Sequence, residues 1–124
     1  MLYYLASPYT SDDIRIQNAR YEAAVTASAL MLKMNKSVYS PIVHWHVIAE
    51  QFIDIPYSRY LENDLEHLLH CDALLVLTIS GWEKSFGVTS ELAHAASNNK
   101  PIFYLSPETG EITNEPRHPS NRYN

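Results

Sequence analysis

Glycine, cysteine and basic residues are scarce in this chain of 124 residues, and each shortage argues against a class of protein. The one cysteine, Cys71, cannot form a disulfide within the chain, so the composition does not indicate a secreted disulfide scaffold. The three glycines are not spaced as the G-x-G-x-x-G fingerprint of dinucleotide-binding domains. Nine Lys and Arg against 14 Asp and Glu give a net charge of −5. Without a basic block, this charge argues against polymeric nucleic acid or a membrane surface as a partner.

Long hydrophobic runs are also lacking. No apolar stretch approaches the roughly 20 residues that span a bilayer. The chain opens on an apolar segment directly after Met1, without the basic region and cleavage pattern of a signal peptide. We therefore expect a cytoplasmic location.

The apolar residues that are present make up 46% of the chain, and they form short runs that alternate with helical spacings. Continuous apolar runs predict buried strands, and apolar residues repeated every three or four positions predict helices that pack on them. On these patterns we expect strands at residues 2–6, 37–42, 73–78 and 101–105, and helices at 16–34, 57–70 and 88–98. Residues 44–55 are ambiguous and could form a short helix up to Phe52.

The alternation of strands and helices predicts a parallel α/β sheet with right-handed crossovers. We expect one domain over residues 1–124, with a core at 2–105 and an irregular tail at 106–124 that is short of apolar residues. Ligands of such sheets bind beyond the carboxyl ends of the strands. The loops at 7–13 and 80–87 follow two of these ends, so they are the expected place of a site.

Two carboxylates interrupt apolar helix stripes. Glu91 lies three residues after Val88, and Asp64 lies three residues after Leu61 and four before Leu68. Burying an ionised carboxylate without partners costs several kcal/mol, so such a position suggests a function. The alternative is an acid at the edge of the stripe that caps a backbone amide or pairs with Lys or Arg.

Glu91 also falls in the first turn of the helix expected at 88–98. There the helix dipole would favour its charged form by roughly 0.3–1 kcal/mol. A poorly hydrated but ionised carboxylate suits a nucleophile, or a charge that faces a developing cation.

Aromatic and imidazole side chains offer further candidates. His44 and His46 flank Trp45 and could bind a metal, but no third ligand has suitable spacing, so we expect no metal. A loop that contacts a nucleobase, with Trp45 or a histidine stacking on it, and ordinary packing are the alternatives. Trp82 could cover the pocket or anchor an interface.

The order of several motifs resembles the nucleoside 2-deoxyribosyltransferase-like superfamily, which includes nucleoside 5′-monophosphate N-glycosidases and small phage and bacterial relatives. The resemblance spans about residues 2–105. The motifs are YLASPY at 4–9, NDL at 63–65, CDA at 71–73, SFGVTSELA at 85–93 and NKPI at 99–102.

This resemblance implies a flavodoxin- or Rossmann-like three-layer sandwich with four to five parallel strands. It also implies cleavage of an N-glycosidic bond without a cofactor. Glu91 matches the glutamate that attacks C1′ of the sugar, Tyr4 matches a tyrosine that orients it, and Asp64 matches an aspartate that contacts sugar or base. The chemistry parallels that of retaining glycosidases. Relatives commonly form dimers and complete each site from the neighbouring subunit, so we expect a homo-oligomer.

Ser85 favours a nucleotide over a free nucleoside. At its position transferases tend to carry aspartate and monophosphate hydrolases serine, and a hydroxyl at a helix N-terminus accommodates a phosphate. Arg15 or Arg20 and hydroxyls of the first loop could add donors. The residues expected to bind substrate are Ser7, Pro8, Tyr9, Arg20, His44, Ser85 and Gly87.

The expected function is cleavage of the N-glycosidic bond of a nucleoside 5′-monophosphate, with a deoxynucleotide favoured. Base exchange between deoxynucleosides is the alternative within the same class. A module that binds a nucleotide without turning it over is the alternative from another class.

Overall fold

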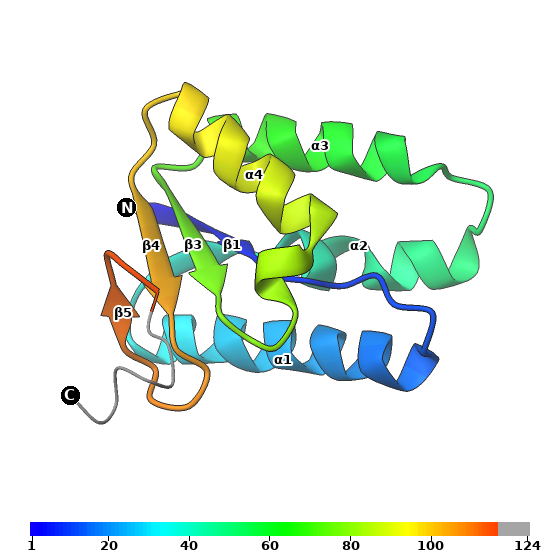
Figure 1. The fold of residues 1–124 in the computed structure, drawn as a ribbon, viewed down its shortest axis with the longest axis horizontal. Coiled ribbons are helices and arrows are strands. Elements are labelled where there is room, and N and C mark those ends of the chain that lie inside the picture. Colours follow the sequence, from blue (N-terminus) through cyan, green and yellow to red (C-terminus); the bar gives the residue numbers. More distant parts are fainter. Residues whose placement is uncertain (117–124) are drawn as a thin grey trace.

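A five-stranded sheet with helices on both faces forms the protein (Figure 1). The computed structural model describes residues 1–116. The elements are β1 (Leu2–Ala6), α1 (Ile14–Lys33), β2 (Ser37–Tyr39), α2 (Pro41–Gln51), α3 (Tyr57–Leu69), β3 (Ala73–Leu77), the 3₁₀ turn η1 (Trp82–Lys84), α4 (Phe86–Ser97), β4 (Ile102–Leu105) and β5 (Ile112–Thr113).

The strand order is β2-β1-β3-β4-β5. The first four strands are parallel, and β5 pairs antiparallel with β4. This is the flavodoxin-like order, in which the chain reverses its direction of travel between β1 and β3. The expected α/β sandwich with a mostly parallel sheet is therefore confirmed.

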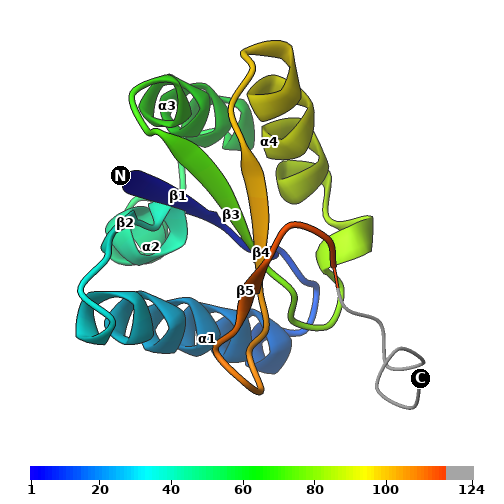
Figure 2. The same ribbon diagram turned by 90° about the vertical axis from the view of Figure 1, so that its left-hand side faces the viewer.

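The alternation of side chains along the strands divides the core into two layers. Tyr4 and Val76 face one side of the sheet and pack with residues of α3 and α4. Leu5 and Leu75 face the other side and pack with Ala27 and Met31 of α1. Figure 2 shows α3 and α4 above the sheet and α1 below it. A third cluster joins α1 to α2 through Ala24, Ile42 and Trp45.

Several element boundaries differ from those expected. The strand expected at 37–42 ends at Tyr39, because Pro41 occupies the first turn of α2 and Ser40 caps that helix. Proline is well suited to this position, where its missing N–H removes no helical hydrogen bond. The ambiguous segment is thus mostly helix, as far as Gln51.

The last helix begins earlier than expected, at Phe86, because Ser85 accepts a hydrogen bond from the Val88 amide and acts as its N-cap. Glu91 consequently lies in the second turn of α4 rather than in the first. In the segment expected to be irregular, residues 112–113 form β5 instead, where Ile112 pairs with Leu105. Residues 117–124 lie outside the described part of the chain.

Candidate functional site

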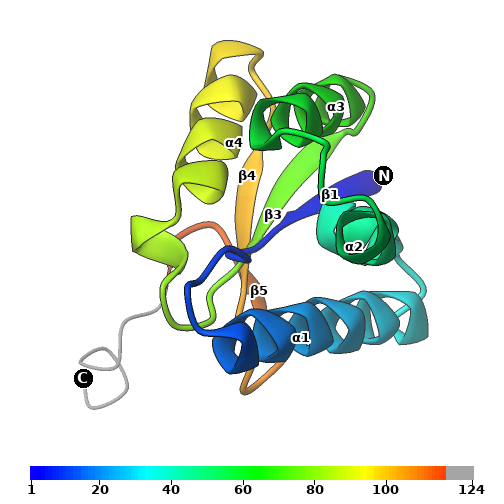
Figure 3. The same ribbon diagram turned by 90° about the vertical axis from the view of Figure 1, so that its right-hand side faces the viewer.

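A cavity of about 460 Å³ opens at the carboxyl ends of β1 and β3. Figure 3 shows that the loops following these two strands lie at the same edge of the sheet. This edge is where the strand order reverses, the usual ligand site of the fold. The lining residues come from six segments and are Ser7, Tyr9, Thr10, Arg20, Pro41, Ile42, Trp45, Tyr57, Leu61, Asp64, Gly81, Lys84, Ser85, Phe86, Gly87 and Glu91.

Glu91 lies on the wall of this cavity with only 5% of its surface exposed. The hydroxyl of the fully buried Tyr4 donates a hydrogen bond to its carboxylate. Burial, reinforced by the nearby charge of Asp64, raises the pKa of Glu91 to about 8, although the Tyr4 hydrogen bond acts in the opposite direction. The expected position of Glu91 in the first turn is wrong, so the free amides at the start of α4 do not favour its charged form.

Asp64 lines the same cavity and is 7% exposed. The indole N–H of Trp45 donates to both carboxylate oxygens at 3.2 Å. Burial raises the pKa of Asp64 to about 7, and the Trp45 hydrogen bond and the nearby His67 reduce that shift. The cavity therefore holds two carboxyl groups that gain or lose a proton near neutral pH.

Neither carboxyl group forms an ion pair with Lys or Arg among residues 1–116. Neither caps a backbone amide there. Their side-chain partners are an aromatic hydroxyl for Glu91 and an indole for Asp64. The alternative of two structural acids at the edge of their helix stripes thus finds no support in the described part of the chain.

Two cationic side chains line the cavity on the side of the loop after β3. Arg20 donates to the carbonyl of Thr10 at 2.8 Å, and Lys84 extends from η1. Gly81 has a φ of 94°, and a Cβ there would lie 2.5 Å from Nη2 of Arg20. Only glycine adopts this backbone readily and leaves room for the guanidinium.

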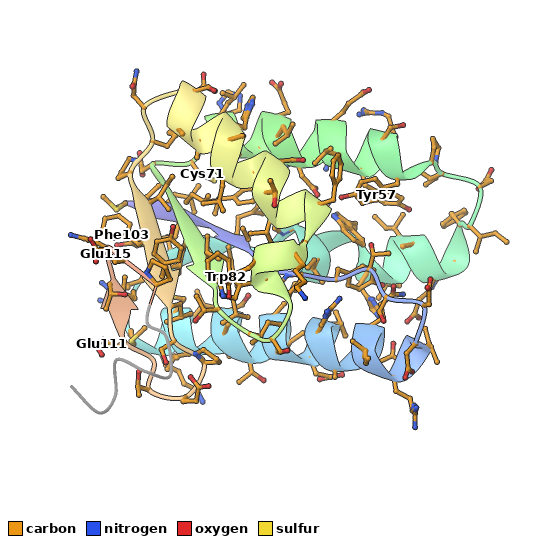
Figure 4. The ribbon with its side chains drawn as sticks, viewed as in Figure 1. Tyr57, Cys71, Trp82, Phe103, Glu111 and Glu115 are labelled. Carbon is orange, nitrogen blue, oxygen red and sulfur yellow. The ribbon has the colours of Figure 1, made fainter. Side chains whose placement is uncertain are left out.

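Hydroxyl groups accompany these cations. Ser7 is buried, and its Oγ has no hydrogen-bond partner among the described residues. Ser85 uses its oxygen as an acceptor for the Val88 amide, so its proton remains available for donation. A Cβ at Gly87 would lie 3.1 Å from the hydroxyl of Tyr57, which reaches the start of α4 (Figure 4).

The structure brings together most of the predicted site residues but not all of them. Pro8 is fully buried and does not line the cavity. His44 is exposed on α2, beside the rings of Tyr39 and His67. In this turn of the helix, the buried side chain is that of Trp45. Pro8 and His44 therefore lie outside the cavity lining, contrary to the expectation that both bind substrate there.

Two further candidates lie elsewhere. Arg15 has an exposed side chain paired with Asp13, so it does not add to the cavity. Trp82 packs against Tyr104 of β4 and is not among the residues that line the cavity. Cavity residues that the sequence analysis missed include Tyr57, Leu61 and Lys84. Tyr57 and Leu61 share the helix stripe of Asp64, and this spacing could have identified them.

Within residues 1–116, no group of three or more His, Cys, Asp or Glu side chains is placed to hold a metal ion. In the same part of the chain, no helix combines the length and the apolar character that crossing a membrane demands.

Comparisons with known proteins agree with this architecture. A model of the family described as a domain of unknown function, DUF1937, matches residues 2–107. A solved 2-deoxyribosyltransferase from the psychrotolerant bacterium Bacillus psychrosaccharolyticus is similar, with a TM-score of 0.60 and 23% identity over 90% of this chain and 76% of that chain. No curated protein matches the chain by sequence. The likeness to this structure confirms the expected fold.

Proposed function

The chain belongs to the DUF1937 family and has the fold of a 2-deoxyribosyltransferase, and on this basis we propose that it cleaves the N-glycosidic bond of a nucleoside 5′-monophosphate. The observation that carries the proposal is the position of Glu91. It is a buried carboxylate without a cationic partner in residues 1–116, oriented by Tyr4, on the wall of a cavity large enough for a nucleotide.

In the first step, the deprotonated Glu91 attacks C1′ of the sugar. The C1′–N bond breaks, its electron pair goes to the base, and a glycosyl ester forms on the carboxylate. Tyr4 holds the attacking group through its O–H donor. The negative charge of Glu91, which is only 5% exposed, also stabilises the oxocarbenium-like transition state.

The leaving base needs a proton, and Asp64 is suited to supply it. With a pKa raised to about 7, this carboxyl group is partly protonated at neutral pH. In the second step, water attacks C1′ and releases Glu91 as a carboxylate. Asp64 takes the proton from that water, so both carboxyl groups return to their starting states.

The cations of the cavity favour a phosphorylated substrate. Arg20 and Lys84 line the same cavity as the hydroxyl-bearing Ser7 and Ser85. Together they form a donor set suited to a phosphate dianion, which a protein of net charge −5 would otherwise repel.

Base exchange is the second candidate, and the likeness to a 2-deoxyribosyltransferase favours it. The same glycosyl ester would then pass to a second base instead of water. The two reactions share the first step and differ only in the acceptor.

A panel of nucleosides and nucleoside monophosphates, analysed by liquid chromatography, tests the proposal. Free base and sugar phosphate from a single nucleotide support hydrolysis. A new nucleoside or nucleotide that forms only when a second base is added supports exchange. Calorimetric binding of a nucleotide without any product, unchanged in Glu91→Ala, contradicts both reactions and identifies a binding module.

A further inference from the structure

Three side chains form a hydrogen-bonded chain behind one wall of the cavity. On α2, Nε2 of His46 lies 2.7 Å from Oε1 of Glu50. On the other side of the ring, Nδ1 of His46 lies 2.7 Å from the hydroxyl of Tyr9. His46 is 5% exposed, whereas the side chain of Glu50 is 58% exposed. The chain thus connects the surface with a residue that lines the cavity.

The partners of His46 determine which nitrogen carries its proton. An ionised carboxylate only accepts, so Nε2 of neutral His46 bears the hydrogen and donates to Glu50. Nδ1 then has a free lone pair and accepts from the Tyr9 hydroxyl. Tyr21 stacks on the imidazole at 3.7 Å between ring centroids and 15° between planes, which restricts the ring further.

The orientation of Tyr9 matters for the cavity because two aromatic rings meet there. Tyr9 contacts Trp45 edge to face, with centroids 4.9 Å apart. Trp45 in turn donates to Asp64. Because the Tyr9 hydroxyl donates its hydrogen bond to His46, it does not act as the phosphate donor expected from the sequence. Tyr9 contributes its ring to the cavity instead.

We propose that His46 is a positioning residue: oriented by Glu50, it holds Tyr9 against Trp45 and so sets the aromatic wall beside Asp64. The part of the inference in which this wall binds the planar base of the substrate rests on the proposed function. The hydrogen-bonded chain itself can be tested without any substrate.

The first experiment measures the tautomer of His46 by ¹⁵N NMR of the imidazole nitrogens. In the uncharged imidazole we expect a protonated Nε2 and a lone pair on Nδ1. Glu50→Gln should weaken this preference, because an amide can donate to Nε2 as well as accept from it. A protonated Nδ1 in the unaltered protein, or a spectrum that does not respond to Glu50→Gln, overturns the inference even if the protein is an active N-glycosidase.

The second experiment compares Tyr9→Phe, Glu50→Gln and the double variant in the nucleotide assay. Each single change should raise KM about three- to tenfold, the equivalent of one hydrogen bond, while kcat stays within about twofold. The double variant should be no worse than Tyr9→Phe, because Glu50 acts only through that hydroxyl. The matched control is Glu66→Gln, which alters an exposed glutamate four residues before His70 and should leave KM unchanged.

Independent, additive effects of Tyr9→Phe and Glu50→Gln on KM, or a loss confined to kcat, overturn the positioning role. If the unaltered protein turns over no nucleotide, the proposed function fails, and the NMR measurement alone decides the inference.

Discussion

The hydroxyl of Tyr4, in the middle of β1, donates a hydrogen bond to the carboxylate of Glu91, which lies 87 positions later in α4. Both side chains are buried, and Glu91 borders the cavity. A buried carboxylate with one neutral donor is under-solvated, which raises its pKa and makes its charged form reactive. The predictions below start from this pair.

Replacing Glu91 with glutamine should lower turnover by roughly a thousandfold or more, because an amide cannot form the glycosyl ester. The amide oxygen can still accept from Tyr4, so the melting temperature at neutral pH should not fall by more than a few degrees. Glu62→Gln, on the exposed side of α3, is the control and should retain full activity. Steady-state kinetics and thermal unfolding measure both effects, and undiminished turnover in Glu91→Gln would exclude the nucleophile role.

Activity should rise with pH to a maximum between about pH 7 and 8 and then fall, because the reaction needs both deprotonated Glu91 and protonated Asp64. In the free enzyme, kcat/KM depends on the deprotonated form of Glu91, whose pKa is raised to about 8 by burial. A rate profile from pH 5 to 9 checks this. A constant rate between pH 6 and 8.5 would contradict the assignment of that proton to the attacking group.

The free energy of unfolding should decrease as pH rises. An unfolded glutamate releases its proton near its ordinary pKa of 4.5, whereas folded Glu91 keeps it to about pH 8. Between these values the folded chain binds more protons than the unfolded chain, so the free energy of unfolding decreases as pH rises. Asp64 acts with the same sign up to about pH 7. Urea titrations at pH 5 and 8 should show the decrease, and Glu91→Gln should reduce it.

Removing the Tyr4 hydroxyl should slow the reaction with little change in KM. In Tyr4→Phe the carboxylate loses a hydrogen bond to a charged group, worth about 1.5–3 kcal/mol, so kcat should fall about 10- to 150-fold. The pKa of Glu91 should rise further, because the Tyr4 bond lowers it in the native site. The pH of maximal rate should therefore move to a higher value; a loss of rate with an unmoved maximum would indicate a purely structural role for Tyr4.

Lys84 should distinguish nucleotides from nucleosides. If it contacts the phosphate, Lys84→Ala should raise KM for a nucleoside monophosphate about tenfold and leave KM for the matching nucleoside unchanged. Lys33→Ala, in the last turn of α1, provides a matched control remote from the cavity lining. Equal effects on both substrates would place the phosphate elsewhere.

Much of this fold could be predicted from local patterns. The apolar run at 73–77 and the stripes of α3 and α4 indicate which faces are buried, and burial of Asp64 and Glu91 follows from their positions on those stripes. The boundaries depended on capping. Ser40 and Ser85 cap helices that begin at Pro41 and Phe86, so the expected strand was too long and the expected helix too short.

The rest of the site depends on contacts that are distant in sequence. Trp45 reaches Asp64 across 19 positions, and no local spacing encodes that hydrogen bond. His44 and His46 looked equivalent in the sequence, but the rotation of α2 exposes the first and buries the second against Tyr9. The raised pKa of Glu91 likewise follows from how deeply it is buried, and a stripe pattern shows which way a side chain faces but not how deep it lies.

The most direct test of the account is mass spectrometry of the protein quenched during turnover of a nucleoside monophosphate. The account predicts an adduct with the mass of the sugar phosphate on the peptide that contains Glu91, and its absence in Glu91→Gln. Product formation by the unaltered protein without any adduct, or with the adduct on another residue, would contradict it.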